Sequence, residues 1–138
     1  MKHFLLVCFL PVTLTAQNMQ QLTEQLGKTV LYGDIALSPD DMHIAWVQSN
    51  AASMSKQTYI RETSGNAPAK LFNIPVIGER TDFDPAWSPD SKALAFFSSA
   101  GEKEQRQLWT VNANGSGAKK ITNLNGYAVR QRWSHDGK

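Results

Sequence analysis

Residue types that serve in serine hydrolases, Ser134, His135 and Asp136, occur consecutively near the C-terminus. A catalytic triad works by convergence in space, with the base and its orienting carboxylate supplied by separate elements. Consecutive residues do not converge in that way. They also fill the place that Ser38-Pro39-Asp40 and Ser88-Pro89-Asp90 fill earlier in the chain. We therefore predict a turn at this position and not a catalytic site.

Motifs for nucleophilic or phosphate chemistry are absent from the sequence. A nucleophile elbow requires Gly-x-Ser-x-Gly, and no two of the 9 glycines lie four positions apart. The glycine pair of a phosphate-binding loop is missing as well. We expect this chain to carry no catalytic residue, no cofactor-binding residue and no cofactor.

The residues that could ligate a metal are sparse. Beyond His3, the histidines are His43 and His135, each beside a predicted turn, whereas zinc sites need three or four ligands with a closely spaced pair. We expect both to be solvent-facing turn residues. The acidic pairs Asp40-Asp41 and Asp82-Phe83-Asp84 lack the five or six oxygens of a calcium loop, so turn and capping roles are predicted, with no metal site.

Tryptophan and arginine residues admit a binding role. Exposed tryptophans mark recognition surfaces, but the tryptophans here lie in apolar runs or at a fixed slot of a repeat, and packing between sheets is the predicted role. Three arginines precede the Ser-Pro-Asp-like turns, where they could meet acidic peptide groups. The simpler interpretation is that they form a solvated wall of the central channel. These residues are Trp46, Trp87, Trp109 and Trp133, and Arg80, Arg130 and Arg132.

Composition places the chain among ordinary globular proteins. Its 138 residues are 41% hydrophobic and 19% charged, which is too apolar for a disordered chain. The net charge of +2 is too small to indicate a nucleic-acid partner. Apart from the N-terminus, no apolar run approaches the ~20 residues of a membrane span.

The N-terminus has the features of a secretory signal peptide. A basic start is followed by an apolar run from Phe4 to Leu10 and then by small residues up to Ala16. We predict a signal peptide over residues 1–16, and an exported, periplasmic or extracellular protein. The single cysteine, Cys8, lies inside this segment, so the mature chain has no disulfide.

An internal repeat is the strongest pattern in the sequence. The run from Leu37 to Val47 recurs from Trp87 to Phe97, and a third copy opens at Trp133. The first offset is 87 − 37 = 50 and the second is 133 − 87 = 46. Repeats of ~40–50 residues with turn signals between short apolar runs are typical of β-propeller blades.

Each repeat is interpreted as four short strands. The Ser-Pro-Asp segment has β-turn chemistry, and the apolar run from Ala93 to Phe97 suits a buried strand. The turn from Asn112 to Gly117 includes an Asn114-Gly115-Ser116 glycosylation sequon, which turn geometry already explains. A short helix is expected over residues 19–26, stopped by Gly27.

The predicted fold is therefore all-β, with four-stranded antiparallel blades in an incomplete ring. A lead-in segment covers residues 17–33 and the partial propeller residues 34–138, with blades at about 34–80 and 81–126 and the start of a third at 127–138. A closed ring needs four to eight blades, so we expect an N-terminal fragment of a longer protein. The sheets are expected to pack through Ile44, Trp46, Leu94, Phe96, Leu71 and Ile121.

The Trp-Ser-Pro-Asp-Gly turn followed by an apolar strand resembles the repeat of bacterial β-propellers of two groups. One is the TolB-like periplasmic propeller of the Tol system, and the other is the N-terminal propeller of prolyl oligopeptidase-family serine peptidases. The resemblance covers residues 30 to 138, with departures at Leu37, Asp41, Ser91 and His135. It implies a propeller, and leaves either group open.

The segment from Leu26 to Asp40 enters the first repeat directly and looks like the start of exported acylaminoacyl- or dipeptidyl-peptidase-like members. The Tol-system protein carries an α/β domain first, which roughly 20 residues do not build. The peptidase resemblance implies a C-terminal α/β-hydrolase domain, absent here, to which the propeller gates peptide access. The implied partners are that domain, the remaining blades and peptide substrates; the alternative is a non-catalytic propeller that binds protein or glycan partners.

Overall fold

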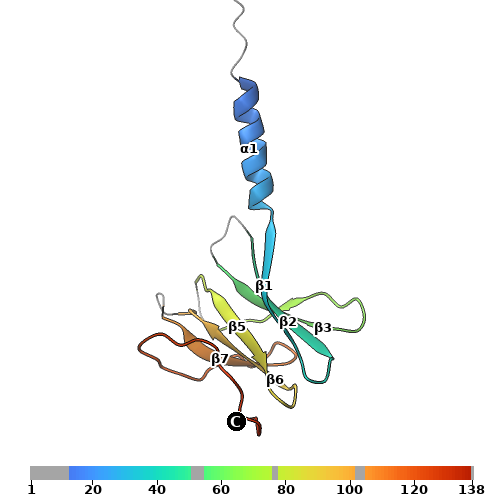
Figure 1. Ribbon diagram of the computed structural model, residues 1–138, viewed down its shortest axis with the longest axis vertical. Coiled ribbons are helices and arrows are strands. Elements are labelled where there is room, and N and C mark those ends of the chain that lie inside the picture. Colours follow the sequence, from blue (N-terminus) through green and yellow to red (C-terminus); the bar gives the residue numbers. More distant parts are fainter. Residues whose placement is uncertain (1–12, 51–54, 76–77, 102–104, 138) are drawn as a thin grey trace, which may run out of the picture.

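The computed structural model describes residues 13–50, 55–75, 78–101 and 105–137, and places them in one helix and two four-stranded antiparallel sheets. The helix α1 spans Thr13–Gly27. The first sheet contains β1 (Val30–Leu37), β2 (His43–Asn50), β3 (Gln57–Glu62) and β4 (Lys70–Leu71). The second contains β5 (Asp82–Trp87), β6 (Ala93–Ser98), β7 (Gln107–Asn112) and β8 (Lys119–Lys120). Figure 1 shows the two sheets side by side as successive blades.

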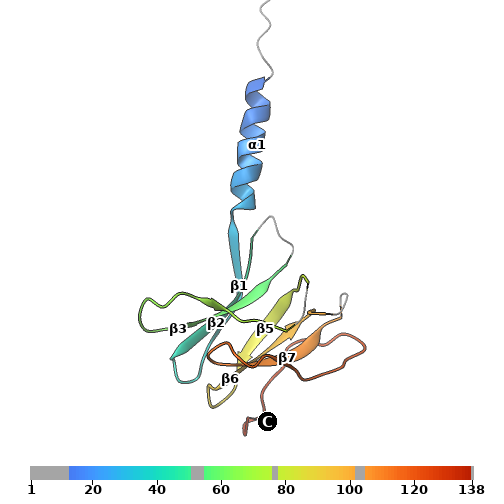
Figure 2. The same ribbon diagram turned by 180° about the vertical axis from the view of Figure 1, so that it is seen from behind.

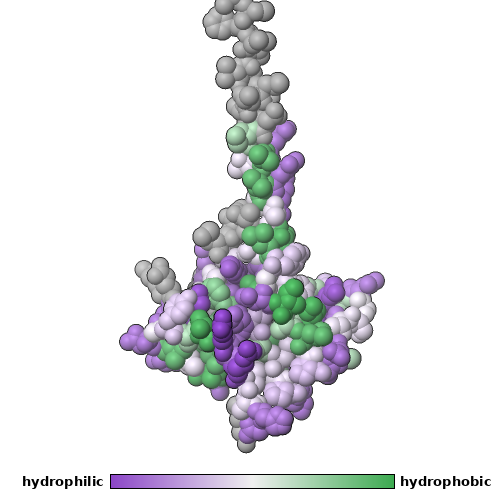
Figure 3. Space-filling model, viewed as in Figure 1, coloured by the Kyte–Doolittle hydropathy of each residue, from purple (hydrophilic) through white to green (hydrophobic). Residues whose placement is uncertain are grey.

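The helix stands away from the sheets and joins them only through β1, as the two opposite views show (Figures 1 and 2). It includes the expected helix over residues 19–26 and begins earlier, at Thr13. The predicted cleavage after Ala16 lies within this helix, and the rest of the predicted signal peptide lies outside the described residues. Figure 3 shows apolar surface along the helix. Its exposed large apolar side chains are Met19, Leu22 and Leu26, whose spacing of three and four residues puts them on one face.

Among the residues that the structure describes, no helix has the length and apolar composition needed to cross a membrane.

Strand order in each sheet follows the sequence, so every strand pairs with its neighbour in the chain. The apolar runs predicted as buried strands are β2 and β6, which lie between two partners in their sheets. The first sheet begins at Val30, before the predicted boundary at residue 34. The all-β, propeller-type fold predicted from the repeat is confirmed.

The Ser-x-Asp turn takes the same form in all three copies of the repeat. The serine hydroxyl donates to the aspartate carboxylate, at 2.6 Å from Ser38 to Asp40 and 2.7 Å from Ser88 to Asp90. These bonds, aided by a backbone N–H at each turn, hold the pKa values of both aspartates below the usual range. The turn is therefore set by local chemistry in each copy.

The third copy differs from the expected strand. Residues 127–133 form no strand in the described structure, because an antiparallel strand needs a ladder partner and these residues have none among those described. They are held beside β5 by side-chain hydrogen bonds, as described below.

The core lies between the two sheets. Leu94 and Phe96 are fully buried in it, as predicted, and Phe72, which directly follows β4, packs on Phe96 at 4.7 Å between ring centroids. The contact between the two sheets is called the seam below. The predicted packing of Ile44 and Trp46 is wrong for this seam, since both are only half-buried. Ile44 and Trp46 occupy the same repeat positions in the first sheet as Leu94 and Phe96 in the second. In the second sheet, the face that carries these positions meets the first sheet. In the first sheet, the equivalent face points away from the second sheet.

The other predicted packing residues, Leu71 and Ile121, are also exposed. They lie in or just after the short outer strands β4 and β8, beyond the seam. The neighbouring Phe72 and Ile74 enter the core instead. Period-2 alternation explains this shift, because adjacent residues of an extended chain point to opposite sides.

A buried aspartate also joins the sheets. The Asp82 carboxylate, with a fully buried side chain, accepts a hydrogen bond from the Thr58 backbone N–H of β3 at 2.9 Å, and Arg80 Nε lies 3.3 Å from the same oxygen. Asp82 N donates to the Lys56 carbonyl at 2.9 Å. Burial raises the pKa of Asp82, and the Arg80 charge opposes that rise.

Leucine truncation tests the placement of the seam. Leu94 is 0% exposed and Leu71 is 45% exposed, so we expect Leu94→Ala to lower the free energy of unfolding by about 2–5 kcal/mol, because it opens a cavity in the core. The matched variant Leu71→Ala should cost under about 1 kcal/mol. Urea unfolding followed by tryptophan fluorescence measures both, and equal losses would contradict the seam.

The raised pKa of Asp82 gives a pH dependence of defined sign. The folded chain holds this proton more tightly than the unfolded chain, so the free energy of unfolding should fall as pH rises from the ordinary Asp range, about 4, through the raised pKa of Asp82. Stability linked to the lowered pKa values of Asp40 and Asp90 is lost only below that range.

We therefore expect Asp82→Asn to flatten the decline of the urea midpoint above about pH 4. Asp41→Asn, a change of the same kind at an exposed turn, should leave the decline in place. A slope that is unchanged in Asp82→Asn would exclude Asp82 as its source.

Candidate functional site

The candidate site lies where the first segment of each copy bends. Equivalent positions in the three copies are Asp34, Asp84 and Arg130, with left-handed φ angles of 45°, 49° and 57°. The strand register shifts at the first two of them, between Gly33 and Ala36 and between Phe83 and Ala86. Such bulges re-aim side chains. The bend turns these charged side chains toward a shared space between the copies.

Indole hydrogen bonds fix the spacing of successive copies. Trp87 Nε1 donates to the Ala36 carbonyl at 3.1 Å, and Trp133 Nε1 donates to the Ala86 carbonyl at 2.9 Å. Each bond ties the first segment of one copy to the first strand of the copy before it. The third copy is therefore docked on the second sheet in the same way that β5 is docked on β1.

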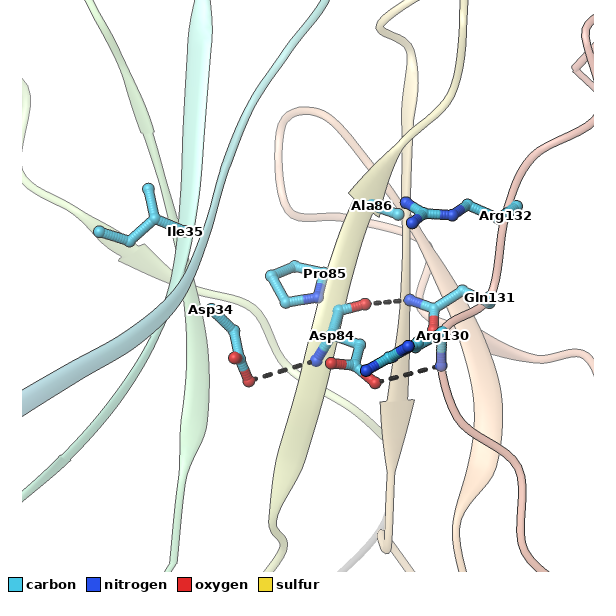
Figure 4. A pocket seen from close by; sticks show the side chains of 8 residues that line it. All are labelled: Asp34, Ile35, Asp84, Pro85, Ala86, Arg130, Gln131 and Arg132. Atoms are coloured by element: carbon cyan, nitrogen blue, oxygen red, sulfur yellow. Dashed lines mark hydrogen bonds between the residues drawn. The ribbon is translucent and has the colours of Figure 1, made fainter.

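The bend residues are linked in a chain. Asp84 N donates to Asp34 Oδ2 at 3.5 Å, and Arg130 N donates to Asp84 Oδ2 at 3.3 Å. Gln131 adds a further link, because its side-chain amide donates to the backbone carbonyls of Asp84 and Ala95. Figure 4 shows the Gln131 side chain extending from the third copy to Asp84 on β5.

These residues line an open cavity of about 230 Å³. Figure 4 shows Asp34 and Ile35 on β1, the β5 residues in the centre, and the third copy on the far side. Within the described chain, no ion pair joins either arginine of the wall to Asp34 or Asp84. The cavity is lined by Asp34, Ile35, Asp84, Pro85, Ala86, Arg130, Gln131 and Arg132.

The third copy places Ser134, His135 and Asp136 in the turn that the repeat predicts. Ser134 Oγ donates to Asp136 Oδ1 at 2.6 Å, and Gly137 N donates to the Ser134 carbonyl at 3.0 Å. His135 is exposed beside them. The serine hydroxyl is hydrogen-bonded to the carboxylate directly, with no histidine between them, so the order of a triad is not formed.

The expectation of a solvent-facing His43 is wrong. Its ring packs on Trp87 with 5.6 Å between ring centroids, and its Nδ1 is buried. His43 opens β2, and the register of the seam carries its side chain to the Trp87 indole. Its packing role comes from the adjoining sheet, which local sequence does not reveal.

Asp40 and Asp41 lie in a turn, as predicted, whereas the turn and capping roles predicted for Asp82 and Asp84 are wrong, because both residues lie in strand β5. Asp40 Oδ1 accepts the Met42 N–H at 3.0 Å, and the Asp41 carbonyl accepts from Thr63 Oγ1 at 2.6 Å. Asp82 lies in the seam and Asp84 at the cavity. Among the described residues, no three histidine, cysteine, aspartate or glutamate side chains gather in a way that would hold a metal ion.

The tryptophans divide between the seam and the outer faces. Trp87 and Trp109 are buried in the core, which confirms packing between sheets for them. Trp46 stacks on Tyr59 on the outer face of the first sheet, at 5.9 Å between centroids. Trp133 is half-buried against the second sheet through its bond to Ala86.

The three arginines also divide. Arg130 and Arg132 line the cavity, where a wall of first-strand residues was predicted. Arg80 does not join them, because it pairs with Asp82 and its guanidinium donates to the Phe72 carbonyl at 3.0 Å. A buried carboxylate needs a compensating charge, and Arg80 supplies it.

Sequence reasoning missed Asp34 and Gln131 as site residues. Asp34 follows Gly33 just before the repeat turn, and its alignment with Asp84 at an offset of 50 was the available signal. Gln131 stands where the other copies have Ile35 and Pro85. A residue that departs from its own repeat is a detectable signal, which the sequence carried without comparison to any other protein.

Comparisons with known proteins agree with the fold. No family model matches the chain. The chain is 31% identical over 108 residues to the "Uncharacterized peptidase YuxL" of Bacillus subtilis (strain 168), an alignment that covers 75% of this chain and 16% of that protein. This chain therefore spans about a sixth of the relative's length, and is similar to part of a protein that is named a peptidase.

Among solved structures, the chain is similar to TolB from Acinetobacter baumannii, with a TM-score of 0.55 and 22% sequence identity. The match covers 79% of this chain and 25% of the TolB chain. The two sheets thus have the arrangement of blades in a TolB-like propeller.

Removal of the Gln131 amide tests how the cavity wall is held. We expect Gln131→Ala to speed amide hydrogen exchange in residues 128–134 by about threefold to tenfold, because it removes hydrogen bonds worth about 0.5–1.5 kcal/mol. Exchange in β6 and β7 should remain unchanged. Gln105→Ala, which alters bonds to Arg106 and Gly126 instead, serves as the control. Uniform acceleration across the sheet in Gln131→Ala would show that Gln131 supports the whole blade.

Proposed function

We propose that this chain is the N-terminal propeller segment of an exported prolyl oligopeptidase-family serine peptidase. In this proposal it carries no catalytic residue and restricts the entry of peptides to an α/β-hydrolase domain elsewhere in the longer protein. The observation that carries the proposal is the 31% identity to a protein named a peptidase, of which this chain spans 16%.

The arrangement of the two sheets supports a gating role. Blades of a propeller surround a central channel, and the first segment of each copy here contributes charged side chains to one cavity. An acidic part from β1 and β5 and a basic part from the third copy would face a peptide that passes through such a channel. The apolar seam keeps these strands at fixed spacing.

A second function is favoured by a separate observation. Similarity to TolB is a similarity of fold, and a non-catalytic propeller that binds protein or glycan partners would have the same blades. The two functions differ in the rest of the polypeptide. Of these two candidates, only the peptidase would carry a Gly-x-Ser-x-Gly elbow followed by aspartate and histidine.

The full-length protein tests the choice. We expect it to react with a fluorophosphonate serine probe and to cleave short peptides, while a folded protein substrate stays intact because the blades restrict entry. Replacement of the elbow serine by alanine should abolish both labelling and cleavage. A protein that ends after six or seven blades and takes no label would establish the binding module instead. Efficient cleavage of a folded protein would contradict the gating role.

A further inference from the structure

We propose that the cavity between β1, β5 and the third copy binds a short zwitterionic peptide, with the peptide ammonium at Asp34 and Asp84 and its carboxylate at Arg130 and Arg132. The inference takes its ligand class from the proposed function and names the part of the propeller that would recognise peptide ends. It does not depend on the presence of a hydrolase domain.

Opposite charges share this cavity without neutralising one another. Asp34 and Asp84 each accept a backbone N–H on one oxygen, at 3.5 Å and 3.3 Å. Neither carboxylate accepts any other hydrogen bond within the described chain, and no described side chain pairs with the Arg130 or Arg132 guanidinium. Two carboxylates and two guanidiniums are thus left to meet a ligand of mixed charge.

The chemistry of the wall selects the ends of a peptide. A carboxylate binds an ammonium group by charge-assisted hydrogen bonds, and a guanidinium binds a carboxylate through two parallel N–H donors. Pro85 and Ala86 of β5 add apolar side chains to the wall of the cavity. A peptide of small residues would place its body against them and its two charged ends on the carboxylates and the guanidiniums.

The size of the cavity suits a small ligand. Its 230 Å³ is below the roughly 300–1,000 Å³ of sites that take drug-sized ligands. This space suits a di- or tripeptide of small residues.

The wall is held in place before any ligand binds. The bend residues have fixed left-handed backbone angles, and the indole and Gln131 bonds hold the third copy against β5. Side chains on a rigid frame lose less freedom when they bind, which favours affinity. Asparagine also tolerates the left-handed region, so Asp→Asn substitutions remove charge and keep the bend.

Peptides that lack one charge test the two halves of the cavity. The full-length protein is first treated with a fluorophosphonate to stop hydrolysis, and trialanine binding is measured by calorimetry. We expect a Kd on the order of 1 mM or lower. N-acetyl-trialanine and trialanine amide should each bind about tenfold more weakly, since each loses a charge-assisted contact.

Substitutions assign each loss to its residues. In the double variant Asp34→Asn with Asp84→Asn, trialanine should bind about tenfold more weakly and acetylation should cause no further loss. In Arg130→Gln with Arg132→Gln, amidation should cause no further loss. The matched control is Arg61→Gln with Glu62→Gln, which changes exposed charges on β3 and should leave all three affinities unaltered.

The proposal is overturned if trialanine does not bind, or if acetylation and amidation weaken binding equally in wild type and in both double variants. The peptidase function is tested separately, by covalent labelling with the fluorophosphonate. The cavity variants do not change that labelling. Trialanine binding without labelling would therefore support the cavity and reject the peptidase. Labelling without trialanine binding would support the peptidase and reject the cavity as a peptide site.

Discussion

The arrangement of the whole structure depends on a hydrogen bond from an indole to a backbone carbonyl of the preceding copy. Trp87 and Trp133 make this bond at the same place in the repeat, to Ala36 and Ala86. The bond is directional, and its donor sits on a large ring that fills the gap between first strands. It sets both the separation of successive copies and the width of the cavity, so the seam and the site share one determinant.

Local signals in the sequence were sufficient to predict the turns of all three copies and the strands of the first two. The Ser-Pro-Asp chemistry is self-contained, because serine and aspartate of the same turn bond to each other. The faces of the strands were harder to assign, because alternation tells which residues share a face but not which face meets a neighbour. Leu94 and Phe96 were placed correctly, whereas Ile44 and Trp46 have the same chemistry and point away from the seam.

The site could be predicted only in part, for a related reason. Arg130 and Arg132 were placed at the cavity by their position before the turn, and Arg80 was placed there wrongly by the same rule. Its partner Asp82 is buried through a contact with the first sheet, and local sequence does not report burial. The bend at Asp34 depends on a left-handed backbone angle, which glycine, asparagine or aspartate indicates only weakly in a sequence.

The order of strands in each sheet has a consequence for how the chain folds. Because each strand pairs with its sequence neighbour, a blade needs no segment from elsewhere in the chain to complete its ladder. Short loops close quickly and at small entropic cost, so the first sheet can form while later blades are still being synthesised. The slow step is then the docking of finished blades, and the order of synthesis becomes the order of assembly.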